Sequence, residues 1–553
     1  MGMFLNSKAP YEAYRLTAAG KYFVDKSEML TELIPALGNP ERFFCITRPR
    51  RFGKSIMANM AGAFFGKAAD AGEIFGKLKI ASGDAAQRLG LAGCGGYRNY
   101  LNKYNVIYID FSLIPENCNS YHAYINRIQK GLKDELIQEY PNLALDPAKA
   151  VWDNLQQLFE RKSEKFIFVI DEWDAVFHLP YITEEEKQDY LRFLRSLLKD
   201  RVYVELAYMT GILPIAKYSD GSEINMFLEY NMATSERFSG YFGFLDSEVD
   251  ELYTVYQSTV KNVKITREEL AGWYDGYQTA ADERIYNPRS VVCALTDNQL
   301  RNYWTSSGTY DSIFYYIKDH IEDLQDDLAL LFSGETVPAD IHEYAAASMQ
   351  LSTKDEIYSA LVVYGLLTYE DGCVFIPNRE LTESYAAMMK KEKSLGYIHD
   401  LANVSKKMLA ATLAGDVKTM ADILEFAHNT ETPVLSYNHE TELSAVVNLV
   451  YLAARDRYRV EREDKAGTGF VDFIFYPERR SADALILELK IDSTPEEAIQ
   501  QIRDKKYALR FKGKLGERPK YTGRILAVGI SYDRETKKHA CKVEELICKG
   551  GPD

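Results

Sequence analysis

Hydrophobic runs and helical stretches alternate along the first third of the chain. Continuous apolar runs, each bounded by polar residues, predict buried strands at 42–47, 104–112, 165–174 and 202–211. A segment with helical apolar spacing, SIMANMAGAFFG, follows the first of these runs. Buried strands separated by helices are typical of a parallel sheet covered on both faces. We therefore predict an α/β domain with a parallel sheet over residues 1–245.

The pattern becomes helical and loop-rich over residues 246–430, with many tyrosines and acidic residues. Within it, residues 356–378 have the pattern of a helix followed by two short strands, with Asp371 and Gly372 at the turn between them. An Asp-Gly pair between two short apolar runs favours a tight hairpin. This predicts a small winged-helix-like element. Its hairpin is interpreted first as structural and alternatively as a contact to nucleic acid.

A third pattern begins at about residue 435. Residues 440–458 have the spacing of an amphipathic helix, and three strand-like runs, a second helix and a further strand follow. The order α-β-β-β-α-β predicts a separate small α/β domain over residues 431–553.

Length and charge limit the classes of function. At about 150 residues per domain, 553 residues allow three or four domains. The balance of 66 basic and 81 acidic residues gives a net charge of −15, which does not indicate a general nucleic-acid binder. Residues 501–524 are an exception, because nine basic and only two acidic residues fall there. This local basic stretch predicts contact with nucleic acid, and a solvated structural face is the alternative.

Cysteine usage and hydropathy indicate the compartment. The seven cysteines are scattered, with no C-x-x-C pair and no secretory leader before them, which favours reduced thiols in a cytoplasm. No apolar run approaches the roughly 18–20 residues that a membrane span needs. We expect a cytoplasmic protein with no membrane contact.

The segment RPRRFGKS, residues 48–55, resembles a phosphate-binding loop in which Arg48 stands where the first glycine is usual. Such a loop works because backbone N–H groups and a helix N-terminus converge on the anion. Lys54 is expected to reach the β- and γ-phosphates of ATP, and the Ser55 hydroxyl to ligate Mg²⁺. The predicted nucleotide-contacting residues of this segment are Arg48, Pro49, Arg50, Arg51, Phe52, Gly53, Lys54, Ser55 and Ile56.

A second motif of the same site ends the strand at FIFVIDEWD. Asp171 is expected to hold Mg²⁺, and Glu172 to polarise the attacking water. Thr210, at the end of the next predicted strand, is either a sensor of the γ-phosphate or a capping residue. Arg237 is a weak candidate for an arginine finger. Lys54 with Ser55 and Asp171 with Glu172, at successive strand ends, predict an ATP-Mg²⁺ site.

These motifs together resemble the predicted AAA-ATPase-like family of bacteria, whose phosphate loop has the form R-P-R-R-F-G-K-S/T. The resemblance covers essentially the whole chain and implies a P-loop ATPase of AAA-like fold. Its one departure is Arg289, where the family more often has an aromatic residue. The segments that carry the resemblance are YFVDKSEMLTELI, RPRRFGKS, VIDEWDA, MTGILPI, GWYDGY and YNPRSV.

The C-terminal domain carries a second constellation. Asp472 lies on one predicted strand and Glu488 with Lys490 on the next, where period-2 alternation puts both on one face. Asp472 and Glu488 are expected to share Mg²⁺, and Lys490 to orient or deprotonate water for attack on a phosphodiester. A buried Glu-x-Lys pair needs a partner or a function, because buried unpaired charge is costly. Further candidates lie on the adjoining helices, namely Gln501 for catalysis and Glu442 as a metal ligand.

This arrangement resembles the PD-(D/E)xK nuclease superfamily, in which Asp472, Glu488, Lys490 and Gln501 fall on motif positions and Glu442 is the helix acid. The resemblance implies a restriction-endonuclease-like fold and metal-dependent cleavage of DNA or RNA. The sequence departs from the common pattern at Val471, where proline is frequent, and at Phe470, where relatives often have arginine.

Three functions agree with these observations. The first is an ATP-dependent or ATP-gated nuclease, in which the middle region transmits the nucleotide state. The second is a nucleotide-dependent switch or scaffold whose nuclease-like domain binds nucleic acid or protein without cutting. The third is an interaction protein with a vestigial phosphate loop, against which the intact Lys54–Ser55 and Asp171–Glu172 pairs argue. Because AAA-like ATPases often assemble, a homo-oligomer is a further expectation.

Overall fold

The computed structural model divides the chain into two compact units. One contains Met1–Ser306 and Ala339–Glu380, and the other contains Ser307–Pro338 and Leu381–Asp553. The three domains predicted from the sequence stay a prediction, and the boundary at 430/431 lies outside the described residues. The described residues are 2–90, 96–116, 118–215, 224–304, 314–341, 351, 353–429, 440–466, 469–477, 479, 481–512 and 523–546.

A five-stranded sheet with the strand order β2-β3-β4-β1-β5 forms the centre of the first unit. Every pairing in it is parallel. The four apolar runs identified in the sequence form four of these strands, and the short edge strand β5 was not predicted. The strands are β1 (Phe43–Thr47), β2 (Asn105–Asp110), β3 (Phe166–Asp171), β4 (Val204–Gly211) and β5 (Leu228–Tyr230).

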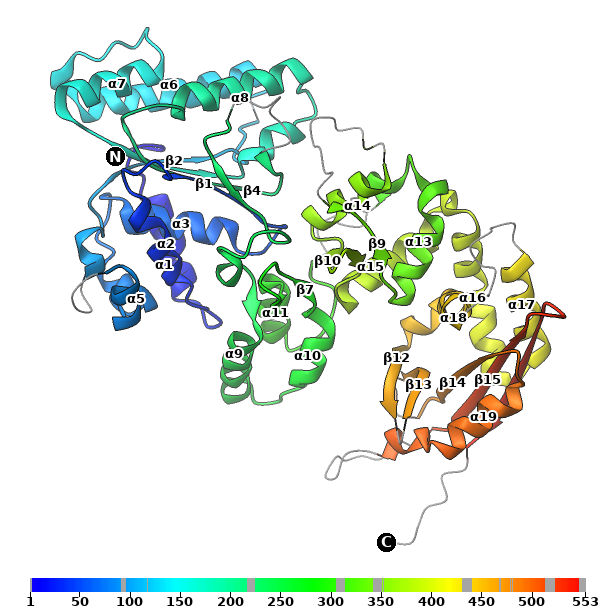
Figure 1. Ribbon diagram of the computed structural model, residues 1–553. Coiled ribbons are helices and arrows are strands. Elements are labelled where there is room, and N and C mark those ends of the chain that lie inside the picture. Colours follow the sequence, from blue (N-terminus) through cyan, green and yellow to red (C-terminus); the bar gives the residue numbers. More distant parts are fainter. Residues whose placement is uncertain are drawn as a thin grey trace. The chain divides into compact units, whose positions relative to one another are not determined.

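Helices cover both faces of this sheet, as its continuously buried strands require. Figure 1 shows α6, α7 and α8 along one face and α1 to α3 along the other. Because parallel strands end at one edge, the register brings Thr47 beside Gly211 and Asp110 beside Asp171. The helices are α1 (Ala9–Ala18), α2 (Leu30–Leu33), α3 (Lys54–Phe65), α4 (Gly72–Phe75), α5 (Gly83–Arg88), α6 (Tyr121–Glu139), α7 (Val151–Lys162) and α8 (Glu184–Leu198).

The first unit continues with a helical region that carries its own short strands. The winged-helix-like element is present: α14 is followed by a β10–β11 hairpin, whose turn residues Asp371 and Gly372 have φ values of 49° and 81°. Positive φ at both central residues is what an Asp-Gly turn provides. The elements are β6 (Phe244–Leu245), α9 (Asp246–Thr259), α10 (Arg267–Tyr274), β7 (Tyr277–Gln278), β8 (Arg284–Tyr286), α11 (Pro288–Asp297), α14 (Lys354–Val363), β10 (Thr368–Glu370) and β11 (Cys373–Phe375).

Helices precede a mixed sheet in the second unit. The helices and the short strand β9 are α13 (Ile321–Ser333), β9 (Val337–Pro338), α15 (Arg379–Lys391), α16 (Tyr397–Ala414), α17 (Val417–Asn429), α18 (Glu440–Val450) and α19 (Pro495–Asp504). The helix predicted over 440–458 is shorter, because α18 ends at Val450 and a 3-10 turn follows over Leu452–Asp456.

The sheet of the second unit has the order β12-β13-β14-β15-β16. The pair β14–β15 is parallel, because α19 forms the crossover between them, and the other pairs are antiparallel. The predicted order α-β-β-β-α-β is present, with β16 as an additional strand, so the predicted fold class is confirmed. The strands are β12 (Tyr458–Ala466), β13 (Gly469–Pro477), β14 (Ala484–Ile491), β15 (Ile525–Asp533) and β16 (Lys538–Glu545).

Candidate functional site

The phosphate loop connects the end of β1 to the start of α3. Gly53 is the N-cap of α3 with φ 93°, a backbone conformation that glycine adopts without strain. A Cβ there would meet no atom within 4 Å, so the backbone rather than space explains the glycine. The first-turn N–H groups of a helix have no intrahelical acceptor. The N-terminus of α3, which begins at Lys54, therefore offers donors and a partial positive charge to an anion.

The other loop residues anchor the loop to distant parts of the first unit. The Arg48 side chain is 1% exposed, donates to the carbonyl oxygens of Thr47 at 2.7 Å and Tyr230 at 2.8 Å, and lies over the Phe242 ring. Burial lowers the pKa of Arg48 to about 9. Thus the arginine in place of the usual glycine ties the loop to the residues around β5.

Phe52, Arg51 and Pro49 also anchor the phosphate loop to residues far away in the sequence. Phe52 packs edge-on against Tyr277 with ring centroids 4.9 Å apart. Arg51 donates to the Tyr303 carbonyl at 2.8 Å. Pro49 lies so close to Gly365 that a Cβ at Gly365 would come within 2.6 Å of it. The side chains of this arginine-rich loop therefore fix its conformation through contacts far away in the sequence.

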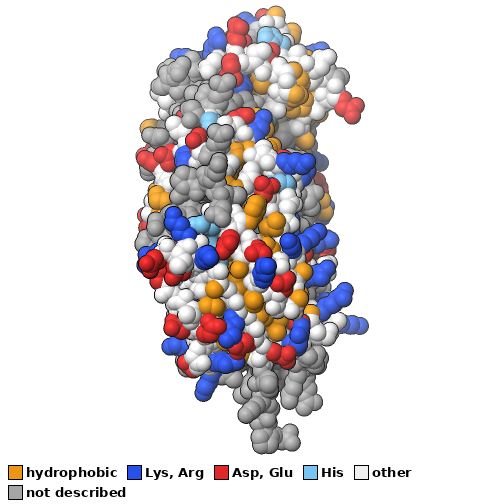
Figure 2. Space-filling view, turned by 90° about the vertical axis from the view of Figure 1, so that its right-hand side faces the viewer, with side chains coloured by type: hydrophobic (Ala, Val, Ile, Leu, Met, Phe, Trp, Pro, Cys, Tyr) orange, Lys and Arg blue, Asp and Glu red, His pale blue; other side chains and the backbone are white. Residues whose placement is uncertain are grey.

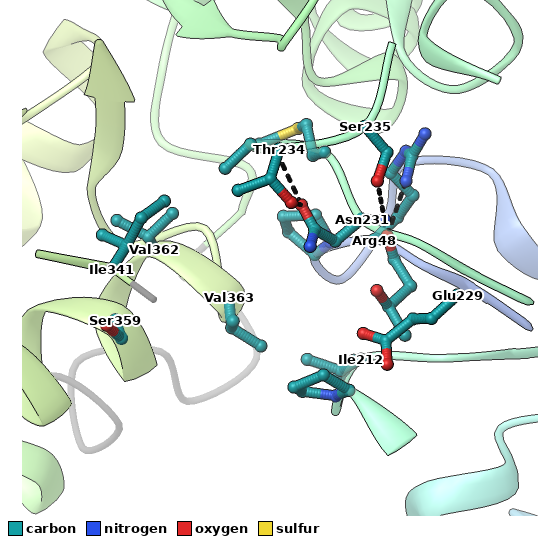
Figure 3. A pocket seen from close by; sticks show the side chains of 15 residues that line it. Arg48, Ile212, Glu229, Asn231, Thr234, Ser235, Ile341, Ser359, Val362 and Val363 are labelled. Atoms are coloured by element: carbon teal, nitrogen blue, oxygen red, sulfur yellow. Dashed lines mark hydrogen bonds between the residues drawn. The ribbon is translucent and has the colours of Figure 1, made fainter. Parts of the chain in front are cut away.

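Arg48 and Pro49 line a cavity of about 280 Å³ that is separate from the one containing Lys54 and Ser55. Figure 3 shows the Arg48 side chain beside Ser235 and Asn231, away from Val362 and Ile341 across the cavity. The expected nucleotide contact of Arg48 and Pro49 is therefore not supported by their position. The physical reason is that their side chains pack against β5 and the region around α14.

Lys54 and Ser55 face the acidic end of β3. Lys54 Nζ donates to the Pro49 carbonyl at 3.2 Å and lies 3.8 Å from Glu172 Oε1. Burial raises the pKa of Asp171 to about 7, against a hydrogen bond from Ser55 that lowers it. Burial also raises the pKa of Glu172, whose φ of 48° is unusual for a residue with a side chain. This brings together the four side chains expected to bind ATP and Mg²⁺.

A further carboxylate, which was not predicted, lies at this edge of the sheet. Asp110 ends β2 in register with Asp171, and its charge contributes to the raised pKa of both Asp171 and Glu172. The sequence contains a usable signal, because Asp110 ends the apolar run YNVIYID in the same way as Asp171 ends FIFVID.

A cavity of about 680 Å³ opens beside the phosphate loop. Its lining includes Arg51 to Ile56 of the phosphate loop, one face of α11, residues of the segment from Tyr14 to Lys26, and Glu172. Tyr22, Phe23, Val24 and Val292 provide apolar walls. A cavity that combines basic and apolar side chains fits a nucleotide, whose phosphates are anionic and whose base is flat and largely apolar.

The remaining predicted residues of this site lie outside the cavity lining. Arg50 is exposed, and its charge acts on Glu172. The Thr210 hydroxyl is buried and donates to the Ile46 carbonyl at 2.9 Å, which agrees with the structural alternative. Arg237 is bonded to Glu32 and to the Tyr230 hydroxyl, both at 2.9 Å. These contacts leave its role as an arginine finger a prediction without support.

The second constellation converges at the middle of the C-terminal sheet. The ladder between β13 and β14 runs from Phe475↔Leu485 to Phe473↔Leu487. One residue further, the Asp472 carboxylate accepts the Leu489 N–H at 2.7 Å. This bond ties the Asp472 side chain to the strand that carries Glu488 and Lys490.

Glu488 is the buried centre of this site, with 2% of its surface exposed. Its Oε1 accepts hydrogen bonds from Lys490 Nζ at 3.2 Å and from the Gln501 amide. Burial and then the charge of Asp472 raise the pKa of Glu488 to about 7. Four predicted residues, Asp472, Glu488, Lys490 and Gln501, are thus brought together.

Tyr507 belongs to the same site and was not predicted. Its side chain is 1% exposed, its hydroxyl is hydrogen-bonded to Gln501, and the charges of Glu488, Asp472 and Lys490 act on it. Burial raises its pKa. Tyr507 lies beyond the end of α19, in the 3-10 helix Tyr507–Lys512, so no local sequence pattern indicated it.

The two carboxylates fit a divalent cation. Glu488 Oε2 is buried without a hydrogen-bond partner among the described residues, and Asp472 adds negative charge. Glu442 lies on α18, and no three His, Cys, Asp or Glu side chains in the described part of the chain form a metal cluster. Mg²⁺ usually keeps several water ligands, so Asp472 and Glu488 would hold it with water.

Part of the basic stretch 501–524 is described, while residues 513–522 lie outside the described residues. Arg503 pairs with Glu544, and Arg524 pairs with Asp483 at 2.6 Å. Lys505 and Lys506 are exposed next to α19. Figure 2 shows a face on which basic, acidic and apolar side chains are interspersed. In the described part of the stretch, the two lysines are the best candidates for a phosphate contact.

Comparison with known proteins finds two family matches in the chain. Residues 12–219 match the family described as Predicted AAA-ATPase, and residues 441–540 match the PD-(D/E)XK nuclease superfamily. No curated protein matches the chain. None of the described helices is both long enough and apolar enough to span a bilayer.

Two solved structures are similar to much of the chain. The Walker-type ATPase of Pyrococcus abyssi is 15% identical, with 65% of this chain and 94% of that chain covered and a TM-score of 0.34. The ORC2 protein of Aeropyrum pernix, in ADPNP–ADP complexes, is 11% identical, with coverages of 70% and 95% and a TM-score of 0.31. These overall superpositions are loose. The family matches, however, confirm the resemblance predicted from the sequence: one region of the chain is similar to the predicted AAA-ATPase family and another to the PD-(D/E)XK nuclease superfamily.

Proposed function

We propose that this protein is an ATP-dependent nuclease: the first unit binds and hydrolyses ATP with Mg²⁺, and the C-terminal domain cleaves DNA or RNA. The observation that carries the proposal is the convergence of Asp472, Lys490 and Gln501 on the buried carboxylate of Glu488. A buried carboxylate with a raised pKa and a specific charge partner is typical of a functional site.

Each residue of the nuclease site has a role in this proposal. Asp472 and Glu488 hold Mg²⁺, and Gln501 fixes the orientation of the Glu488 carboxylate. Lys490, whose side chain is 23% exposed, reaches from Glu488 towards solvent and orients or deprotonates the attacking water. Bound Mg²⁺ supplies charge stabilisation to the phosphodiester and lowers the pKa of its water ligands.

Each residue of the ATPase site also has a role in this proposal. The N-terminus of α3 and Lys54 bind the phosphates, Ser55 and Asp171 hold Mg²⁺, and Glu172 accepts a proton from the attacking water. Lys54 donates to the Pro49 carbonyl and lies 3.8 Å from Glu172. Bound ATP would draw Lys54 onto its phosphates and leave Glu172 available for water.

The test is cleavage of single- and double-stranded DNA and RNA with Mg²⁺ or Mn²⁺, in the presence and absence of ATP. Wild type should cut at least one substrate, and Glu488→Ala and Lys490→Ala should not. Lys54→Ala should remove ATP turnover and the ATP dependence of cleavage. Lys77→Ala, at an exposed lysine whose side chain is 73% accessible, and Lys418→Ala, on the exposed face of α17, are matched controls that should behave as wild type.

The alternative outcomes separate the functions. ATP binding without cleavage of any substrate would leave the switch or scaffold, whose nuclease-like domain binds without cutting. Absence of ATP binding by wild type would leave the interaction protein with a vestigial loop. In the favoured case the partners are ATP and a nucleic acid that contacts the 501–524 stretch. The proposal also includes a cytoplasmic location and a homo-oligomer. It divides the chain into three domains, over residues 1–245, 246–430 and 431–553.

A further inference from the structure

The cavity beside the phosphate loop carries an excess of positive charge. Its lining contains one acidic side chain, Glu172, and five basic ones, listed last in this paragraph. Three of these charges have an acidic neighbour, since Lys26 pairs with Glu248 at 2.6 Å, Lys54 lies near Glu172, and the charge of Glu380 acts on Arg51. The cavity therefore suits an anion with more charge than Lys54 alone would neutralise. The basic residues are Lys21, Lys26, Arg51, Lys54 and Arg289.

Arg289 is placed on the cavity by the start of α11. The Asn287 side chain caps this helix by accepting the N–H groups of Arg289 at 3.1 Å and Ser290 at 3.2 Å, and Pro288 occupies its first turn. Ser290 is fixed in turn by its hydroxyl, which donates to Glu380 at 2.8 Å. The backbone at Arg289 is thus held rigidly, while its side chain is exposed.

One face of α11 lines the cavity, through Arg289, Val292, Cys293 and Thr296. Their spacing of i, i+3, i+4 and i+7 is that of a single helical face. Arg289 is the basic end of this face. The rest of the face consists of the uncharged side chains of Val292, Cys293 and Thr296. This order matches a nucleotide, whose phosphates and base lie at opposite ends.

The surroundings of Arg289 also favour an anion beside its guanidinium group. Its guanidinium makes no hydrogen bond or ion pair with any described residue, whereas Arg51 is bonded to the Tyr303 carbonyl. The two guanidinium groups are close enough that Arg289, after burial, lowers the pKa of Arg51. Two neighbouring like charges repel each other, and an anion between them would remove this repulsion.

We propose that Arg289 is a nucleotide-binding residue, which contacts the phosphate chain from α11 and thereby supplements the phosphate loop. This inference rests on the proposed ATP site and adds to it a residue outside the phosphate loop and the strand-end motifs. Arginine suits this role because its planar fork of donors matches phosphate oxygens.

The experiment measures the affinities of the purified full-length chain for ATP, ADP, AMP and adenosine by titration calorimetry. Arg289→Ala should weaken ATP binding by about 10- to 100-fold, the loss expected for a charge-assisted hydrogen bond. The loss should decrease with the number of phosphates and vanish for adenosine. Arg289→Lys should recover part of the affinity, because it restores the charge without the fork.

A matched control is Arg284→Ala, which removes one exposed arginine from β8, outside the cavity lining. Its ATP affinity and the melting temperatures of all nucleotide-free variants should equal those of wild type. An Arg289→Ala affinity equal to wild type, or an equal loss for adenosine and ATP, would overturn the inference while leaving the ATP site intact. Wild type that binds no ATP would overturn the ATP site and the inference together.

Discussion

Lys490 Nζ donates to Glu488 Oε1 at 3.2 Å, while the other carboxylate oxygen of Glu488 is buried and accepts no hydrogen bond among the described residues. A buried carboxylate that is only half satisfied is costly, and its pKa rises accordingly. Since Asp472 adds a second negative charge, the site is incomplete without a cation or a proton. This relationship makes the metal-free site sensitive to pH.

The first prediction concerns this sensitivity. The pKa of Glu488 is raised from its ordinary 4.5 to about 7, so between these values the folded state binds a proton that the unfolded chain has lost. Metal-free stability should therefore fall as pH rises from about 4.5 to about 7, by about 1.4 kcal/mol per unit of pKa displacement. Melting temperatures measured in chelator across this range should show the fall.

Glu488→Gln is the matched variant for this prediction. It keeps the shape of the side chain and removes the charge, so it should melt higher than wild type at pH 8 and show a weaker pH dependence. Mg²⁺ should raise the melting temperature of wild type more at pH 8 than at pH 5.5 and should have less effect on the variant. Parallel curves for the two proteins would contradict the assignment of Glu488.

The second prediction concerns Tyr507, whose hydroxyl bonds Gln501, the residue that orients Glu488. Tyr507→Phe should lower the cleavage rate by about 5-fold, because one net hydrogen bond of about 1 kcal/mol is removed from the support of the site. Tyr458→Phe changes another buried tyrosine of the C-terminal domain, on β12, and should leave cleavage unchanged. Equal rates for both variants would make Tyr507 a packing residue only.

The third prediction separates ATP binding from hydrolysis. Glu172→Gln should retain ATP affinity, because Lys54 and Ser55 are unchanged, and should slow turnover by about 100- to 10,000-fold through loss of the general base. Asp171→Asn should instead weaken the Mg²⁺ dependence of binding. Phosphate release and nucleotide titration measure the two effects. Normal turnover by Glu172→Gln would show that another group, such as Asp110, accepts the proton.

The fourth prediction concerns Asp174, the third acid of the segment DEWD, residues 171–174. Asp174 is buried, and one of its oxygens accepts the N–H groups of Ile212 at 3.1 Å and Leu213 at 2.9 Å. Asp174→Ala would leave both donors buried without an acceptor, so urea unfolding should show a loss of about 2–4 kcal/mol. Asp174→Asn keeps an acceptor oxygen and should recover most of the loss. Equal stabilities of the two variants would argue against this structural role.

Local sequence pattern determined much of this protein. The strands β1 to β4 and β12 to β15 are long apolar or alternating runs, so their periodicity identifies them without knowledge of their partners. The glycine at 53, the acidic pair at 171 and 172, and Glu488 with Lys490 stand at strand ends or on one strand face. Backbone geometry alone therefore brings them to common edges of the two sheets.

Only the tertiary structure decided how the remaining residues are used. Arg48 looked like a phosphate ligand in the sequence, but its guanidinium bonds the Tyr230 carbonyl, 182 residues away. Asp110 lies beside Asp171 through strand register, Tyr507 reaches Gln501 from beyond the end of a crossover helix, and a helix cap places Arg289 on the cavity lining. The edge strands β5 and β16 were also not predicted from the sequence. Such contacts depend on packing between segments distant in the chain, and packing leaves no periodic signal in the local sequence.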